Sequence, residues 1–201
     1  MKPHSLTARE EELDVFFGII NRFIGYFTRD SIRASQNDTR SEYPFVPMDS
    51  RQAYAQISLA RDLLRHGKKM AAGASFLDVG CGIGNVLLMA EMMDFKVYGI
   101  EKDAYPYGIA RKLMGDDCVA QDDIWQFDRY HDFDVIYYFR PFAEKKLQTD
   151  FERMIEAKLK PGGILIANRK MDMGIDTNPD FRRLEEQWPV WQKNPQEADN
   201  A

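Results

Sequence analysis

A short apolar run that passes through a glycine-rich turn into a helical segment limits the fold of this chain more than any other feature. The run is Phe76–Val79, and glycine follows at every second position as Gly80, Gly82 and Gly84. Residues 86–93 are rich in apolar side chains and read as a helix. Glycine adopts positive φ angles and allows close approach of the backbone, so such a turn suits a strand that runs directly into a helix. The segment predicts the first strand–helix unit of a parallel sheet.

The alternation of short apolar runs and helical segments continues along the chain. Further strands are predicted at Lys96–Ile100, Cys118–Ala120, Asp134–Phe139 and Ile164–Ala167, and further helices at Tyr105–Met114 and Phe142–Leu159. The run DVIYYF is apolar almost throughout, which is typical of a strand covered on both faces. We therefore predict an α/β fold with a doubly wound, mostly parallel sheet.

The segment after Ala167 is short and polar. It holds about 34 residues rich in Asp, Asn, Pro and Met. We interpret Arg182–Trp188 as a short helix and Val190–Gln192 as a short strand. So little chain leaves few residues for further strands, and we expect a sheet that is reduced at its C-terminal edge.

Two helices are predicted before the first strand. The first runs from Thr7 to Thr28, and Thr7 and Glu10 have the spacing of a capping box. Its apolar side chains recur at helical spacing, and we expect this stripe to pack on the domain, with a dimer contact or a lid as alternatives. The stripe consists of Leu13, Phe16, Phe17, Ile20, Phe23, Ile24 and Phe27. The second helix spans Ser50–His66, and Gly67 is its stop signal.

Domain boundaries follow from this reading. Residues 1–70 form an N-terminal helical extension packed on the core, residues 71–193 form the sheet domain, and residues 194–201 form a flexible tail. A chain of 201 residues is long enough for one domain with a substantial core.

Composition limits the classes of partner. A net charge of −5 argues against nucleic-acid binding by bulk charge. No apolar stretch approaches the length of a membrane helix, and acidic residues near the N-terminus break any secretory pattern. Two cysteines and three histidines, without metal-ligand spacing, are too few for a zinc site, so we predict no metal. We expect a cytoplasmic protein with reduced thiols.

Two carboxylates flank the glycine turn. Asp78 lies just before the turn, and Glu101 closes the next predicted strand, 21 residues after Gly80. A dinucleotide fingerprint has the spacing G-x-G-x-x-G and seats a pyrophosphate, whereas this chain has G-x-G-x-G and an acid that would repel one. The carboxyl ends of adjacent parallel strands meet at one crevice, where Glu101 can accept hydrogen bonds from ribose hydroxyls. The pattern favours a cationic amino-acid ligand joined to a nucleoside.

On these motifs, residues 70–168 resemble the class I S-adenosylmethionine-dependent methyltransferases. The resemblance implies that Gly80, Gly82 and Gly84 shape the loop under the methionine part of the cofactor, with Asp78 near its amino group and Glu101 on the ribose. It also implies an acid on the adenine amino group after the third strand, where Asp122 and Asp123 are equal candidates. Ile124 or Trp125 would cover the adenine ring. Cys81 and Lys102, beside these motifs, complete the predicted cofactor-binding residues.

The end of the fourth strand lies beside the transferring methyl group in the resembled family. Here it reads Tyr137-Tyr138-Phe139-Arg140, and we take Tyr138 and Arg140 as the candidate catalytic residues that orient the acceptor. The segment Tyr43–Pro47 is a second candidate, since it vaguely resembles an aromatic–proline segment that borders the cofactor site of some protein-lysine methyltransferases. Neither the N-P-P-Y type motif nor a Pro-Cys nucleophile of nucleic-acid methyltransferases occurs here.

These observations predict a methyltransferase that acts on a small molecule or a protein side chain. Methyl transfer from a sulfonium chiefly requires alignment of donor and acceptor, so a catalytic triad is not needed. A non-catalytic S-adenosylmethionine-binding or regulatory protein of the same fold is the first alternative, and a nicotinamide-dependent oxidoreductase is the second. The oligomeric state is left open.

Overall fold

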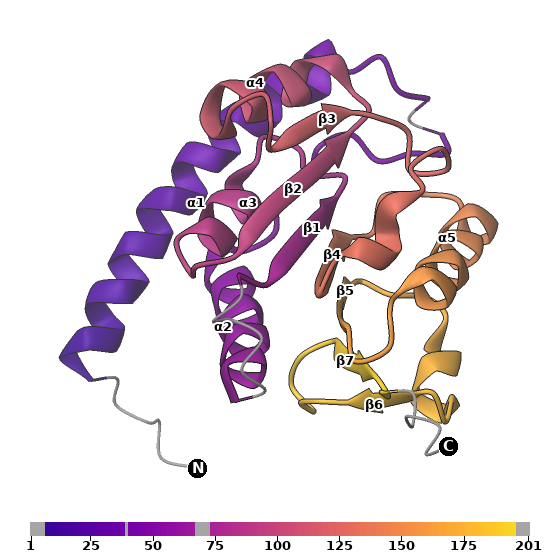
Figure 1. The fold of residues 1–201 in the computed structure, drawn as a ribbon. Helices are drawn as coiled ribbons and strands as arrows, with labels where there is room; N and C mark the ends of the chain where they lie inside the picture. The colour runs from indigo at the N-terminus through magenta and orange to yellow at the C-terminus, as the bar shows by residue number, and fades with distance from the viewer. Residues whose placement is uncertain (1–6, 39, 67–72, 196–201) are drawn as a thin grey trace.

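The computed structural model describes residues 7–38, 40–66 and 73–195. They form an α/β fold around one sheet with the strand order β3-β2-β1-β4-β5-β7-β6 (Figure 1). The strands are β1 Ser75–Val79, β2 Lys96–Glu101, β3 Val119–Gln121, β4 Val135–Phe139, β5 Ile164–Asn168, β6 Phe181–Arg183 and β7 Val190–Lys193. The helices are α1 Ala8–Ala34, α2 Ser50–His66, α3 Asn85–Glu91, α4 Ala104–Met114 and α5 Lys145–Lys158, with short 3-10 helices at Arg129–Asp132 and Met173–Thr177.

The first five strands are parallel and are covered on both faces. β1 lies at the centre, paired with β2 on one side and with β4 on the other. On β4, Val135 and Tyr137 pack into the hydrophobic cluster that includes α2, α3 and α4, while Ile136 and Tyr138 pack into the cluster that includes α5. Alternate side chains of a strand point to opposite faces, which explains why this strand is apolar at nearly every position. The predicted doubly wound, mostly parallel sheet is confirmed.

The C-terminal edge is complete, so the expected reduction of the sheet is wrong. The predicted strand at Val190–Gln192 is present as β7, antiparallel to β5, with Trp191 opposite Leu165 and fully buried. The predicted helix at Arg182–Trp188 is also wrong, because β6 pairs antiparallel with β7 in this region. Pairing with an apolar buried strand supplies β6 with a hydrogen-bond ladder that a seven-residue isolated helix could not match.

The N-terminal segment begins as predicted but extends further. Thr7 accepts a hydrogen bond from the Glu10 backbone N–H, and Glu10 caps Thr7 in return. The helix α1 continues six residues past Thr28 to Ala34 and packs against α2 and α4 at the edge of the molecule (Figure 1). It buries Phe17 and Ile24 of the predicted stripe and exposes Phe16 and Phe23. The other members of the stripe, Leu13, Ile20 and Phe27, are half-buried. The helix α2 has the predicted bounds.

Three expectations fall outside the described residues. These are the stop signal at Gly67, the boundary between residues 70 and 71, and residues 196–201 of the predicted flexible tail. Within the described part of the chain, no helix combines the length and the apolar character needed to cross a membrane.

The helix α5 begins later than the sequence predicts, because the residues before it pair with a segment of the N-terminal extension. The predicted helix Phe142–Leu159 begins three residues later, at Lys145. Phe142 instead forms an antiparallel bridge with Glu42, and Ala143 donates a backbone hydrogen bond to Ser41. A segment from the N-terminal extension is thereby fixed over the carboxyl ends of the strands.

Candidate functional site

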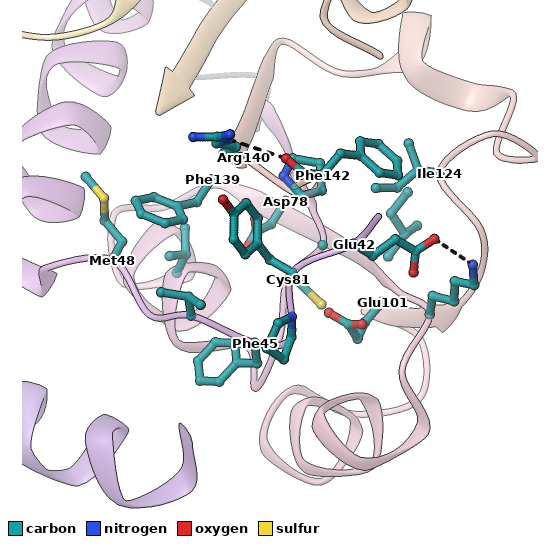
Figure 2. Close-up of a pocket in the computed structure, with 18 of the residues that line it drawn as sticks. Glu42, Phe45, Met48, Asp78, Cys81, Glu101, Ile124, Phe139, Arg140 and Phe142 are labelled. Atoms are coloured by element: carbon teal, nitrogen blue, oxygen red, sulfur yellow. Dashed lines mark hydrogen bonds and ion pairs between the residues drawn. The ribbon is translucent and has the colours of Figure 1, made fainter. Parts of the chain in front are cut away.

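A cavity of about 300 Å³ opens at the carboxyl ends of the parallel strands. Its floor comes from the ends of β1, β2, β4 and β5, and its roof from the connection between α1 and α2 (Figure 2). Several side chains predicted from the sequence face this one space, which is the crevice that an open parallel sheet offers to ligands. Those that line it are Asp78, Gly80, Cys81, Glu101, Lys102, Asp122, Asp123, Ile124 and Arg140.

The glycine loop is tied by its backbone to the neighbouring strand. Gly80 and Cys81 both donate N–H hydrogen bonds to the Ile100 carbonyl, at 2.9 and 3.0 Å. Gly84 has a φ of +84° and begins α3 as its N-cap residue. Gly82 and Gly84 do not line the cavity, but they shape the loop that does. The alternating glycines are therefore used for backbone conformation, as the spacing predicted.

One residue of the loop also leaves no room for a side chain. Gly82 has a φ of +56°, and a Cβ atom on it would lie 2.1 Å from the nearest ring carbon of Phe45. The Phe45 ring therefore rests directly on the Gly82 backbone. This contact joins the roof of the cavity to the loop, and it explains why glycine is needed at this position.

The Glu101 carboxylate holds the loop and the start of α4 together. Its Oε2 accepts a hydrogen bond from the Gly82 N–H at 2.9 Å, and its Oε1 accepts one from the Asp103 N–H at 2.8 Å. Burial raises the pKa of Glu101 to about 7, although these backbone hydrogen bonds act in the opposite direction. The two motifs that the sequence identified separately are thus one hydrogen-bonded unit.

Asp78 is a buried carboxylate without a hydrogen-bond donor. It is 2% exposed and lines the cavity, and no hydrogen bond or ion pair with another described residue reaches its oxygens. Burial, and secondly the charge of Glu101, raise the pKa of Asp78 well above its usual value. A carboxylate in this setting is strongly stabilised by a cation that enters the cavity.

The two acids after β3 differ in how many of their carboxylate oxygens already accept a hydrogen bond or form an ion pair. Asp123 accepts a hydrogen bond from the Trp125 N–H on Oδ1 and forms an ion pair with Lys102 through Oδ2, at 3.2 Å. Asp122 accepts the Asp123 N–H on Oδ1, and its other oxygen has no donor among the described residues. Ile124 lines the cavity, whereas the Trp125 ring stacks on Phe142 outside it.

The two candidate catalytic residues lie in different places. Arg140 lines the cavity, with its guanidinium 5.3 Å from the centre of the Tyr43 ring and its Nε donating to the Phe142 carbonyl at 3.3 Å (Figure 2). Tyr138 does not line it, since its ring packs on Phe151 of α5 on the other face of the sheet. The neighbouring Tyr137 lies on the cavity side, because adjacent strand residues face opposite ways.

The roof and one arginine complete the lining. The segment Tyr43–Pro47, a second candidate in the sequence, lines the cavity together with Glu42 and Met48. Glu42 forms an ion pair with Lys102 at 2.9 Å, and Tyr43 donates a backbone hydrogen bond to the Pro141 carbonyl. Arg169, which directly follows β5, was not among the site residues predicted from the sequence. Its place after the last predicted parallel strand was the signal that could have found it.

Comparison with protein-family models gives one match that covers most of the chain. The family model described as a methyltransferase domain matches residues 51–195. Among solved structures, an RNA methyltransferase from Salinibacter ruber in complex with S-adenosyl-L-homocysteine (SAH) superposes with a TM-score of 0.53 at 20% identity. The superposition covers 78% of this chain and 98% of that one, and at this identity it shows likeness of fold alone.

Other matched structures are longer proteins with a lower score. DesVI from Streptomyces venezuelae gives a TM-score of 0.45 at 22% identity, covering 59% of this chain and 51% of that one. The sugar N-methyltransferase KedS8 from a Streptoalloteichus species gives 0.47 at 21% identity, covering 67% and 56%. The chain therefore spans about half the length of these two proteins. No curated protein sequence matches the chain.

Proposed function

The chain belongs to the methyltransferase domain family, and on this premise we propose that it transfers a methyl group from S-adenosylmethionine to a small molecule bound in the cavity. The predicted family, enzyme class, fold and cofactor are confirmed at the level of the family. The residue assignments and the acceptor are proposals.

The buried carboxylate of Asp78 is the observation that carries the cofactor assignment. It faces the cavity without a protein donor, and the adjacent Glu101 charge makes its ionisation still less favourable. The ammonium group of a bound methionine moiety would satisfy Asp78 with a charge-assisted hydrogen bond. A pyrophosphate beside these two acids would be repelled, which disfavours the oxidoreductase alternative.

The rest of the cofactor follows from the order of the strands. Glu101, at the end of β2, faces the same cavity and can accept hydrogen bonds from the ribose hydroxyls, because each of its oxygens has a second lone pair. Asp122, next to β3, keeps one carboxylate oxygen free for the adenine amino group, and Ile124 supplies an apolar surface for the ring. We therefore choose Asp122 over Asp123, whose oxygens are already engaged.

The bound cofactor supplies an electrophilic methyl group on a sulfonium centre. The protein orients the acceptor and excludes water from the reaction. The roof, fixed over the cavity by its backbone bridge to Phe142, supplies the exclusion. Tyr137 and Arg140 lie at the end of β4, and we assign acceptor orientation to Arg140. Tyr138 packs in the hydrophobic cluster that includes α5, on the face of the sheet away from the cavity, so we no longer propose it to orient the acceptor.

The space beside the cofactor favours a small acceptor. Residues of the roof close one side of a cavity of about 300 Å³, and the proposed cofactor already occupies part of that volume. A protein side chain that enters the cavity alone is the second candidate acceptor. Nucleic acid remains disfavoured by the net charge of −5. The expected cytoplasmic location stays a prediction.

Calorimetric titration with S-adenosylmethionine and with SAH tests the proposal. The wild-type protein should bind both ligands, and Asp78→Asn should weaken binding about tenfold or more, because it removes a buried charge-assisted hydrogen bond. Asp116→Asn, at a carboxylate whose side chain is 81% exposed, is the matched control and should bind as the wild type does.

Two results would change the assignment. A wild-type protein that binds neither ligand would overturn it. Binding without methyl transfer in an acceptor screen with a radiolabelled methyl donor would instead favour the non-catalytic alternative.

A further inference from the structure

Two arginines occupy equivalent positions on neighbouring strands. Phe139 at the end of β4 is paired with Asn168 at the end of β5, and the next residues are Arg140 and Arg169. Both arginines line the cavity. Neighbouring strands are about 4.8 Å apart, so the two side chains start from adjacent points of the floor.

The backbone at both positions has an unusual conformation. Arg140 has a φ of +22° and Arg169 a φ of +57°, whereas only three non-glycine residues of the described chain have a positive φ. A left-handed conformation is unfavourable for a residue with a Cβ atom, and such strain gathers at functional sites. Two strained arginines side by side at one cavity point to a function for their side chains.

The surroundings of each arginine hold its backbone in place. The Arg140 N–H donates to the Asn168 carbonyl at 3.2 Å. The Asn168 side chain forms two hydrogen bonds with the buried Gln56, at 2.8 and 3.0 Å, and the Lys170 ammonium forms an ion pair with buried Glu152. Arg169 therefore lies between two anchored residues, which fixes where its side chain begins.

Neither guanidinium has an anionic partner. The third cation of the cavity, Lys102, is neutralised by Glu42 and Asp123. Within the described part of the chain, no carboxylate lies within ion-pair distance of Arg140 or Arg169. The Arg140 guanidinium donates only to the Phe142 and Ala143 carbonyls, which carry no net charge. Two arginines that line one cavity from adjacent strand ends, without an anionic partner, match a carboxylate or a phosphate group, which can accept several charge-assisted hydrogen bonds.

The strand order places this pair beyond the reactive end of the cofactor. In the proposed arrangement, adenine lies near β3, ribose at β2 and the methionine amino group at β1. Arg140 and Arg169 follow β4 and β5, on the opposite side of β1. We propose that the methyl acceptor carries an anionic oxygen group, a carboxylate or a phosphate monoester, which Arg140 and Arg169 bind. This assignment rests on the proposed function.

Binding of small aromatic probes, measured by calorimetry with and without SAH, tests the assignment. Benzoate and phenyl phosphate carry the two anionic groups, while benzamide and benzylamine are the neutral and cationic controls. At least one anion should bind and the controls should not. Arg169→Gln and Arg140→Gln should each weaken its binding about tenfold, the size expected for hydrogen bonds to a charged group.

Further variants separate the explanations. Arg140→Gln removes both the charge and the contacts of Arg140 with its loop, so Arg140→Lys, which keeps the charge, separates the two effects. Arg65→Gln, at the C-terminal end of α2, is the control substitution of an arginine. Equal binding of all four probes, or anion binding that both glutamine variants leave unchanged, would overturn the assignment. A loss of SAH affinity in the glutamine variants without a change for the anions would assign the pair to the cofactor carboxylate. A wild-type protein that does not bind SAH would remove the proposed function, and the acceptor assignment with it.

Discussion

The part of the cavity that we propose for the methionine and ribose of the cofactor lies within one β–α–β unit, whereas the proposed acceptor end is assembled from segments far apart in the chain. At the cofactor end, backbone hydrogen bonds join the glycine loop to β2, and Glu101 accepts the Gly82 N–H. At the acceptor end, Arg140, Arg169 and the roof come from three separate connections. Local backbone geometry therefore fixes the proposed methionine and ribose part, while tertiary contacts fix the proposed acceptor end.

Gly82→Ala should have the largest effect, and it would break the local geometry itself. A Cβ atom would meet the Phe45 ring at 2.1 Å, and the φ of +56° is unfavourable for alanine. We expect the free energy of unfolding to fall by about 2–4 kcal/mol from strain and overpacking together. Urea unfolding measures it, and Phe45→Ala in the same chain should recover the overpacking part. An unchanged stability would contradict the close contact.

Glu101→Gln should change the pH dependence of stability. The folded protein keeps a proton on Glu101 up to a pH of about 7, whereas the unfolded chain loses it near the ordinary glutamate pKa of 4.5. The wild-type protein should therefore lose roughly 3 kcal/mol of stability from this group as the pH rises from 4.5 to 7. The variant should lack this contribution. The free energy of unfolding of the variant minus that of the wild-type protein should therefore be larger at pH 8 than at pH 5.

The binding of SAH should depend on pH in the opposite sense. If the ribose needs ionised Glu101, affinity should fall about tenfold for each pH unit below 7, since one proton must leave on binding. Calorimetry between pH 5.5 and 8.5 would show this slope. Glu101→Gln should bind weakly and should lose the part of the slope that comes from Glu101, while the raised pKa of Asp78 accounts for any slope that remains. A wild-type affinity that is constant over this range would remove Glu101 from the ribose.

Glu42→Gln should have the smallest effect, and it tests how much one ion pair of the roof contributes to closing the cavity. It removes the ion pair with Lys102, whose side chain is 49% exposed, and such a pair contributes less than about 1 kcal/mol. We expect nearly unchanged stability and a modest rise in the dissociation rate of SAH, measured by stopped-flow displacement. A loss as large as that of Gly82→Ala would show that the ion pair closes the cavity.

Sequence reasoning predicted the local features and missed those that depend on distant contacts. The capping box at Thr7, the parallel strands and the glycine loop all follow from short-range patterns and are present. The antiparallel edge β6–β7 was missed, since Arg182 and its neighbours form a strand only because Trp191 is buried beside β5. The placement of Tyr138 was also missed, since a one-residue step along β4 moves a side chain to the opposite face.

The amino-acid sequence alone predicted the fold family and the side chains that we propose for the methionine and ribose, because Asp78, the glycines and Glu101 follow fixed offsets along one β–α–β unit. The side chains that we propose for the acceptor depend on the tertiary structure. The register of β4 against β5 sets Arg140 beside Arg169, and the bridge between Glu42 and Phe142 fixes the roof above them. These contacts join residues about 30 to 100 positions apart, and short-range sequence patterns carry no signal for pairings of that range.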